Sequence, residues 1–174
     1  MSVKLISYSK GEKDESLQDI IAYTARVSNP SNQDNTETSE RLLRYLIREK
    51  HWSPFEMVSA CLEVTTTRDI ARQLLRHRSF SFQEFSQRYA DPTQDLNFIM
   101  RQARLQDTKN RQNSIELSNM MDSDERVDLE LNWYKQQAEV TNAAKKSYEW
   151  AIENGIAKEQ ARSVLPEGIM ESRL

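Results

Sequence analysis

The thirteen-residue segment Arg76–Arg88 holds the residue types best suited to binding a phosphate-bearing ligand. It contains three arginines, one histidine, one glutamate and three serines, and it has no lysine. Arginine presents a planar fork of N–H donors that binds phosphate through two hydrogen bonds, and it stays charged in proteins. Three phenylalanines lie among these polar residues, which suits a ligand with a flat ring. The segment therefore indicates a structured site for a ligand that carries both a phosphate and a ring.

The composition excludes several classes of protein. The 174 residues are 37% hydrophobic and 29% charged, which suits one globular domain with a real core. The net charge is −3, whereas a general nucleic-acid-binding domain is normally basic. No apolar run approaches the ~20 residues of a membrane-spanning helix, and the N-terminus lacks the apolar core of a signal peptide. We therefore expect a cytoplasmic protein that binds neither nucleic acid nor membrane.

The single cysteine, Cys61, excludes an intrachain disulfide and suits a reducing compartment. Its position in a predicted strand, between Ala60 and Leu62, favours a small buried hydrophobe over a catalytic nucleophile. With one cysteine and two histidines in the chain, we expect no metal site.

The apolar pattern predicts a single α+β domain over residues 1–174, in which strands and helices position the segment. Alternating runs predict strands over residues 3–7 and 55–66, and the segment is expected to enter another near Phe85–Tyr89. Apolar residues at helical spacing predict helices over residues 15–28, 38–50, 68–76, 126–154 and 157–163. Ser39 and Glu40 are suited to capping the second helix, and Asn154-Gly155 to ending the long one. The polar residues 91–125 predict a long mobile excursion with one short strand near Phe98.

Several polar residues admit both a structural and a functional interpretation. Arg68, Arg72 and Arg76 fall four apart on one predicted helix face, which is also typical of a solvated surface. His51 lies at a helix-to-strand junction, where histidine usually faces solvent or caps a helix. Glu84 is equally consistent with a structural ion pair and with a ligand contact.

Four residues at fixed spacing resemble the signature of the flavin-dependent thymidylate synthase family. That signature is Arg-His-Arg, seven residues and Ser, which is matched by Arg76-His77-Arg78, residues 79–85 and Ser86. Further segments resemble the family in the same order, and they are Ala25–Ser28, His51–Glu56, Ala71–Gln73 and Ala161–Pro166. The resemblance covers nearly the whole chain and is weakest over residues 91–125.

The resemblance implies an enzyme that methylates dUMP to dTMP. It implies that the carbon comes from methylenetetrahydrofolate and the reducing equivalents from NADPH through bound FAD. It further implies a homotetramer with shared active sites, and a mixed or antiparallel sheet flanked by helices. The resemblance also implies that no protein thiol acts as a nucleophile, which agrees with the expectation for Cys61.

Carried over position by position, the resemblance implies two overlapping sets of binding residues. Ser86 and Arg88 are expected to position the uracil ring and the phosphate, and Glu84 is expected to be held by Arg76 and Arg78. His51 is expected at the outer flavin face, where folate or nicotinamide stacks. The FAD set is Ser28, Ser53, Glu56, Arg76, His77, Arg78 and Glu84. The dUMP set, part of which comes from a neighbouring subunit, is Gln73, Arg76, Glu84, Ser86, Gln87, Arg88 and Arg162.

The sequence departs from the family pattern at its end, since it stops at Leu174, shortly after Leu165-Pro166. Family members continue through a further strand and helix, which carry an Asn, a His and an Arg of the active site. This departure keeps a second interpretation open, namely a non-catalytic nucleotide- or flavin-binding subunit, or half of a split enzyme. An Arg-rich RNA-binding module is a third interpretation, which the acidic net charge disfavours.

Overall fold

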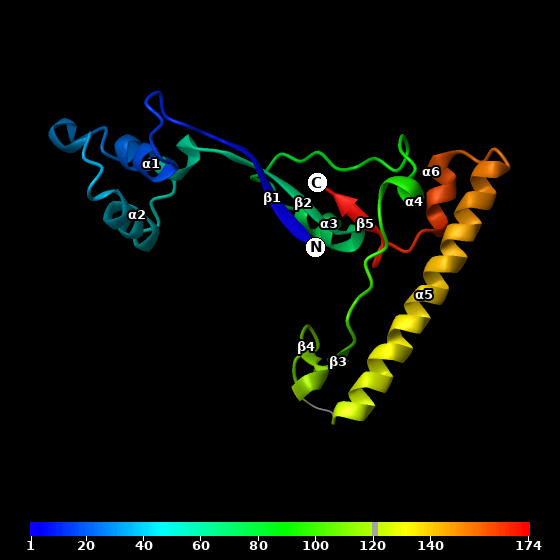
Figure 1. Ribbon diagram of the computed structural model, residues 1–174. Helices are drawn as coiled ribbons and strands as arrows, with labels where there is room; N and C mark the ends of the chain where they lie inside the picture. The colour runs from blue at the N-terminus through cyan, green and yellow to red at the C-terminus, as the bar shows by residue number, and fades with distance from the viewer. Residues whose placement is uncertain (120–121) are drawn as a thin grey trace. The chain divides into compact units, whose positions relative to one another are not determined.

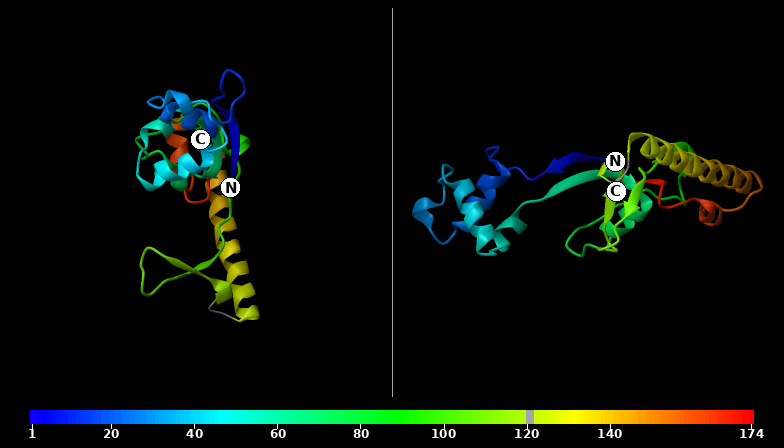
Figure 2. Two further views of the ribbon diagram at one scale, coloured as in Figure 1. Left: turned by 90° about the vertical axis from the view of Figure 1, so that its left-hand side faces the viewer. Right: turned by 90° about the horizontal axis from the view of Figure 1, so that it is seen from below.

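The computed structural model describes residues 1–119 and 122–174, which divide into two compact units. The N-terminal unit is Val3–Glu63, and the C-terminal unit is Met1–Ser2 together with Val64–Leu174. The elements of each unit are shown in Figure 1, and from two further directions in Figure 2. The single domain expected over residues 1–174 stays a prediction.

The N-terminal unit packs helix α1 (Leu17–Ala25) against helix α2 (Ser39–Arg48), as the helical spacing predicts. Ile21 and Leu46 are buried apolar side chains of these two helices. The connection between the helices includes the 3-10 turn η1 (Pro30–Asn32) and is closed by the buried Arg26. Its guanidinium donates to the Asn35 carbonyl oxygen and, at 2.8 Å, to the Thr38 hydroxyl.

Two local predictions in this unit are wrong. Residues 55–57, predicted as strand, belong to the 3-10 helix η2 (Ser53–Met57), because Pro54 in its first turn favours a helical start. Ser39 is not the cap of α2, which begins after Thr38 without a side-chain cap. The Ser39 hydroxyl instead donates to the Asp19 carboxylate of α1 at 2.7 Å.

A three-stranded sheet of order β1-β2-β5 contains strands β1 (Ser2–Tyr8), β2 (Ala60–Thr67) and β5 (Glu171–Arg173). β5 runs antiparallel to β2, with Thr65 opposite Arg173 and Thr67 opposite Glu171. Helix α3 (Arg68–Leu74) follows β2 directly, as predicted. The mixture of helices with an antiparallel sheet confirms the predicted α+β class.

Helix α5 (Ser123–Glu153) spans 31 residues and confirms the predicted long helix. The Asp122 carboxylate caps it by accepting hydrogen bonds from the N–H groups of Asp124 and Glu125, both at 3.1 Å. It ends at Glu153 with Asn154 as its C-cap, and Gly155 adopts a left-handed φ of 76°, which favours glycine. Figure 1 shows helix α6 (Lys158–Ala161) beside the C-terminal end of α5. The core between them contains Tyr148, Ala151, Ala161 and Leu165.

Residues 91–119 contain more regular structure than the sequence predicts. Helix α4 (Pro92–Asp95) is followed by the antiparallel hairpin of β3 (Arg104–Gln106) and β4 (Ser114–Glu116), and by η3 (Leu117–Asn119). The strand predicted near Phe98 is confirmed only as a single bridge to Met170. The buried Gln137 of α5 fixes the chain after this bridge, since its amide accepts from the Arg101 N–H at 2.7 Å and donates to the Arg101 carbonyl at 2.9 Å. Within the described ranges, no helix is long and apolar enough to cross a membrane.

Candidate active site

The signature segment begins where α3 unwinds. The N–H groups of Arg76 and His77 donate to the carbonyls of Gln73 and Leu74, at 3.2 and 3.0 Å, so the helix tightens into a last turn. Gln73 is exposed at this end of α3. The start of the signature is therefore presented from a defined helix terminus.

The strand predicted over residues 85–89 is wrong. Residues 81–86 are irregular, and residues 87–89 form a turn in which the Tyr89 N–H donates to the Ser86 carbonyl at 3.2 Å. Only Phe85 makes a strand-like bond, since its N–H donates to the Arg173 carbonyl of β5 at 2.8 Å. β5 thus fixes the segment at one point.

The three arginines of the segment are exposed, and none of Arg76, Arg78 and Arg88 forms an ion pair with a described residue. A guanidinium without a carboxylate partner can bind an external anion. The His77 ring lies 5.3 Å from the Phe80 ring, and Phe80 is 63% exposed. The segment therefore offers cationic donors beside an open flat surface.

Glu84 has partners other than those predicted. Its Oε1 accepts a hydrogen bond from the Ser172 hydroxyl at 2.9 Å and from Arg68 Nη1 at 3.4 Å. The prediction that Arg76 and Arg78 hold this carboxylate is wrong. Arg68 is buried, so the predicted stripe of α3 arginines is not a uniformly solvated face.

The turn after Glu84 presents the residues expected at the nucleotide. Ser86 is half-buried, and its Oγ accepts from the Arg88 N–H at 3.4 Å. The Arg88 guanidinium lies over the Tyr89 ring, 5.9 Å from its centre. Gln87 is buried, and its Nε2 has no hydrogen-bond partner among the described residues. An unsatisfied buried donor of this kind is one that a ligand can satisfy.

The segment that carries Arg162 is tied to the signature through the preceding short helix, α6. Lys158 of α6 donates from Nζ to the Tyr89 carbonyl at 3.1 Å, which anchors α6 on the turn of residues 86–89. Arg162 begins the 3-10 turn η4 (Arg162–Val164), four residues after this anchor, and is half-buried. The structure therefore brings the Arg162 segment to the signature across a long stretch of sequence.

The other predicted site residues, Ser28, His51, Ser53 and Glu56, are exposed and belong to the N-terminal unit. The position of His51 is fixed within that unit, because its N–H donates to the Leu46 carbonyl at 2.8 Å and stops α2. Their roles at a shared site stay predictions.

Cys61 lies in β2 as predicted, but it is exposed, so the expectation of a buried hydrophobe is wrong. All seven residues of β1 and the first three of β2 are exposed, so this part of the sheet does not bury its side chains.

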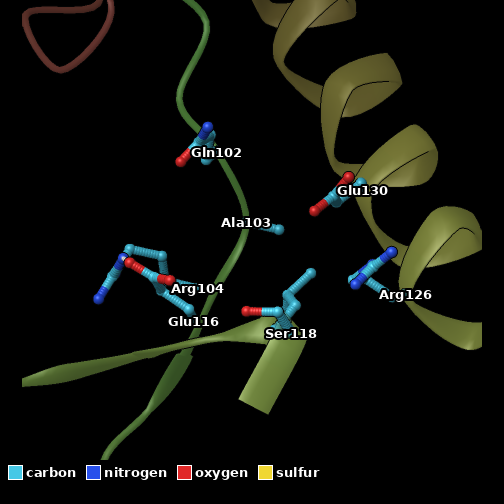
Figure 3. Close-up of a pocket in the computed structure, with 8 residues that line it drawn as sticks. Gln102, Ala103, Arg104, Glu116, Ser118, Arg126 and Glu130 are labelled. Atoms are coloured by element: carbon cyan, nitrogen blue, oxygen red, sulfur yellow. Dashed lines mark hydrogen bonds and ion pairs between the residues drawn. The ribbon is translucent and has the colours of Figure 1, made fainter. Parts of the chain in front are cut away.

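A cavity of about 320 Å³ lies outside the signature segment. Figure 3 shows Arg126 and Glu130 of α5 on one side of it and Gln102 and Ala103 on another. It contains none of the predicted site residues. In the part of the chain that the structure describes, no group of His, Cys, Asp and Glu side chains could hold a metal ion.

Comparison with known proteins decides the family. Residues 4–172 match the family model described as thymidylate synthase complementing protein. The chain is 48% identical over 168 residues to the probable flavin-dependent thymidylate synthase of Paramecium bursaria Chlorella virus 1. It is 49% identical over 172 residues to the flavin-dependent thymidylate synthase of Synechocystis sp.. The chain belongs to the flavin-dependent thymidylate synthase family. Each of these matches covers 95% of this chain and 74% of the relative.

A solved structure with a similar fold agrees with this assignment. The crystal structure of a UMP/dUMP methylase, PolB, from Streptomyces cacaoi bound with 5-Br dUMP is similar with a TM-score of 0.75 at 25% identity. The match covers 99% of this chain and 70% of that one. The fold predicted from the family resemblance is therefore confirmed.

Membership of this flavin-dependent family implies FAD as the cofactor. The residues present fit that group. Arg76 and Arg78 supply charged donors without carboxylate partners in the described ranges, and FAD carries two phosphates that accept such bonds. The exposed Phe80 ring beside His77 supplies a surface on which a flat ring can lie.

Proposed function

We propose that this protein is a thymidylate synthase that converts dUMP to dTMP, with methylenetetrahydrofolate as the carbon donor, NADPH as the reductant and FAD as the cofactor. Two relatives of 48% and 49% identity are named for thymidylate synthesis, and a solved structure of the same fold is named a UMP/dUMP methylase. The observation that carries the proposal is the complete Arg-His-Arg…Ser signature, whose arginines are exposed and lack ion pairs among the described residues.

On the cofactor side, Arg76 and Arg78 bind FAD through charge-assisted hydrogen bonds, and His77 lies beside the ring surface of Phe80. When bound, FAD supplies the redox chemistry that links NADPH to the methyl group. The expected set also includes Glu84, Ser28, Ser53 and Glu56. His51 is expected at the folate or nicotinamide face.

On the substrate side, Arg88 binds the dUMP phosphate, and Ser86 orients the uracil ring. The tight turn of residues 86–89 carries both side chains, and Lys158 of α6 donates a hydrogen bond to this turn. Ser86 acts as a hydrogen-bonding group and not as a nucleophile, because no described side chain within hydrogen-bond distance serves it as a base. The remaining substrate contacts are Gln73, Arg76, Glu84, Gln87 and Arg162.

The proposal includes a cytoplasmic homotetramer with active sites shared between subunits. It is supported by exposed apolar side chains on the N-terminal half of α5, including Leu131, Trp133 and Tyr134, which are 50%, 42% and 54% exposed. An exposed cysteine suits a reducing compartment. Membranes and nucleic acid are not among the proposed partners.

Reconstitution with FAD tests the proposal. The purified chain, incubated with FAD and desalted, is expected to show flavin absorbance that NADPH bleaches under anaerobic conditions. The double variant R76A/R78A is expected to retain little flavin, because it removes two charged donors. The matched control is R111A, which removes an exposed arginine outside the signature and is expected to retain flavin normally. Wild-type protein that takes up no flavin would contradict the proposal.

A further inference from the structure

Glu84 is anchored by a buried arginine that lies outside the signature. Arg68 is the first residue of α3 and is 8% exposed. Its Nη1 lies 3.4 Å from Glu84 Oε1, and its Nε lies 3.7 Å from Glu167 Oε1. Charged groups are rarely buried unless they are paired, so Arg68 is a specific partner of these carboxylates.

A second anchor comes from β5. Ser172 is fully buried, and its hydroxyl donates to Glu84 Oε1 at 2.9 Å. Both anchors therefore end on the same oxygen of Glu84. In residues 1–119 and 122–174, no donor reaches the other oxygen, Oε2, within hydrogen-bond distance. The Glu84 side chain is 21% exposed, so Oε2 is the carboxylate oxygen left for a partner from outside.

The backbone near Arg68 and Glu84 is fixed by hydrogen bonds to residues 170–173, the segment that carries Ser172. The Arg68 N–H donates to the Met170 carbonyl at 2.8 Å, and the Phe85 N–H donates to the Arg173 carbonyl at 2.8 Å. The backbone segments that carry Arg68 and Glu84 are thus each hydrogen-bonded to the segment around β5, which also carries Ser172. Because the neighbouring backbone and one carboxylate oxygen of Glu84 are held by protein partners, this carboxylate loses rotational freedom before a ligand binds.

We propose that Arg68 and Ser172 are positioning residues that hold Glu84 Oε1, so that Oε2 accepts a hydrogen bond from an N–H or O–H group of the bound nucleotide. This inference rests on the proposed function, because it takes the nucleotide as the ligand of Glu84. Arg68 and Ser172 act only through Glu84 and do not touch the substrate. A carboxylate that is already oriented binds its partner more tightly, since less ordering is needed on binding.

A double-mutant cycle tests this role. R68M removes the guanidinium and keeps a long apolar side chain, and E84Q removes the charge that Arg68 holds. Each single variant is expected to raise the KM for dUMP and its dissociation constant by about tenfold, with a smaller change in kcat. The double variant is expected to be no worse than E84Q alone. Additive effects of the two changes would overturn the proposal, since a general structural defect would add to the loss of Glu84.

Matched variants separate this role from folding. R72M is the control, because Arg72 lies on the same helix and pairs with Glu167 but not with Glu84. It is expected to leave the dUMP affinity unchanged, and R68K to restore part of it. If R68M does not fold, S172A replaces it in the cycle, since it removes a single hydroxyl. Wild-type protein that binds no dUMP overturns the proposed function, whereas wild-type binding with an additive cycle overturns the positioning role alone.

Discussion

Arg88 carries the most direct functional expectation for a single side chain. It is exposed, it lies over the Tyr89 ring, and its backbone is part of a tight turn. Arg88→Ala should raise the KM for dUMP at least about tenfold, because a charge-assisted hydrogen bond to phosphate is worth about 1.5–3 kcal/mol. Steady-state kinetics with varied dUMP measure this, and Arg111→Ala serves as the exposed control. An unchanged dUMP dependence would refute the assignment of Arg88.

Tyr148 offers a test of packing at the same scale. Its ring is fully buried, and its hydroxyl has no hydrogen-bond partner among the described residues. Burial raises the pKa of Tyr148, and the charge of Asp91 raises it further. Tyr148→Phe keeps the ring and removes the unsatisfied hydroxyl, so the free energy of unfolding should rise by about 1 kcal/mol. Urea unfolding measures this, with Tyr134→Phe as an exposed control on the same helix. A loss of stability on Tyr148→Phe would show that the hydroxyl has a partner.

Residue identities at the signature were predictable because the signature is local. Arg76, Ser86 and Arg88 are close in sequence, and their spacing alone indicates a binding segment. The partners of Glu84 were not predictable in the same way. Ser172 lies 88 residues away on a strand of three residues, which is too short for a periodic pattern.

At the scale of elements, the start of α1 is stabilised by a carboxylate shared between two helices. Asp19 accepts hydrogen bonds from the hydroxyls of Ser16 at 2.6 Å and Ser39 at 2.7 Å. These bonds hold the pKa of Asp19 below its ordinary value of 3.8, with Ser16 as the larger cause. Because the folded-state pKa is lowered, the stabilisation is fully present above the unfolded pKa and is lost as the pH falls through the folded one.

Asp19→Asn should therefore destabilise the protein by about 1 kcal/mol at pH 7, and the difference from wild type should shrink below about pH 4. Urea unfolding at a series of pH values measures both effects. Glu12→Gln, which changes an exposed carboxylate before α1, is the control. A stability difference that is constant from pH 7 to pH 3 would contradict the role of the Asp19 charge.

Helices were more predictable than strands in this chain. α5 and α3 follow from helical spacing because periodicity over several turns is a strong signal. β3, β4 and β5 have three residues each, so their position depends on tertiary partners and not on a pattern. At residues 55–57 the alternating pattern predicts a strand that does not form. These residues continue the 3-10 helix that begins beside Pro54.

For the whole molecule, the proposed homotetramer is tested at α5. Its N-terminal half exposes Val127, Leu131 and Tyr134, the apolar stripe that the sequence places on one helix face. Leu131→Glu should lower the oligomeric mass seen by size-exclusion chromatography with light scattering, because a buried unpaired charge is costly at an interface. Asn142→Glu, an exposed polar position on the same helix, should leave the mass unchanged. A tetramer that survives Leu131→Glu would exclude this face from the interface.

The central claim is that this chain methylates dUMP in a flavin-dependent reaction. The most direct measurement is tritium release from [5-³H]dUMP with FAD, methylenetetrahydrofolate and NADPH present, compared with reactions that each omit one component. UMP labelled at the same position tests the wider specificity named for the Streptomyces cacaoi enzyme. We predict tritium release from dUMP that requires all three components and is lost in R88A at low dUMP. No release from dUMP by flavin-loaded protein, with all substrates present, would contradict the account.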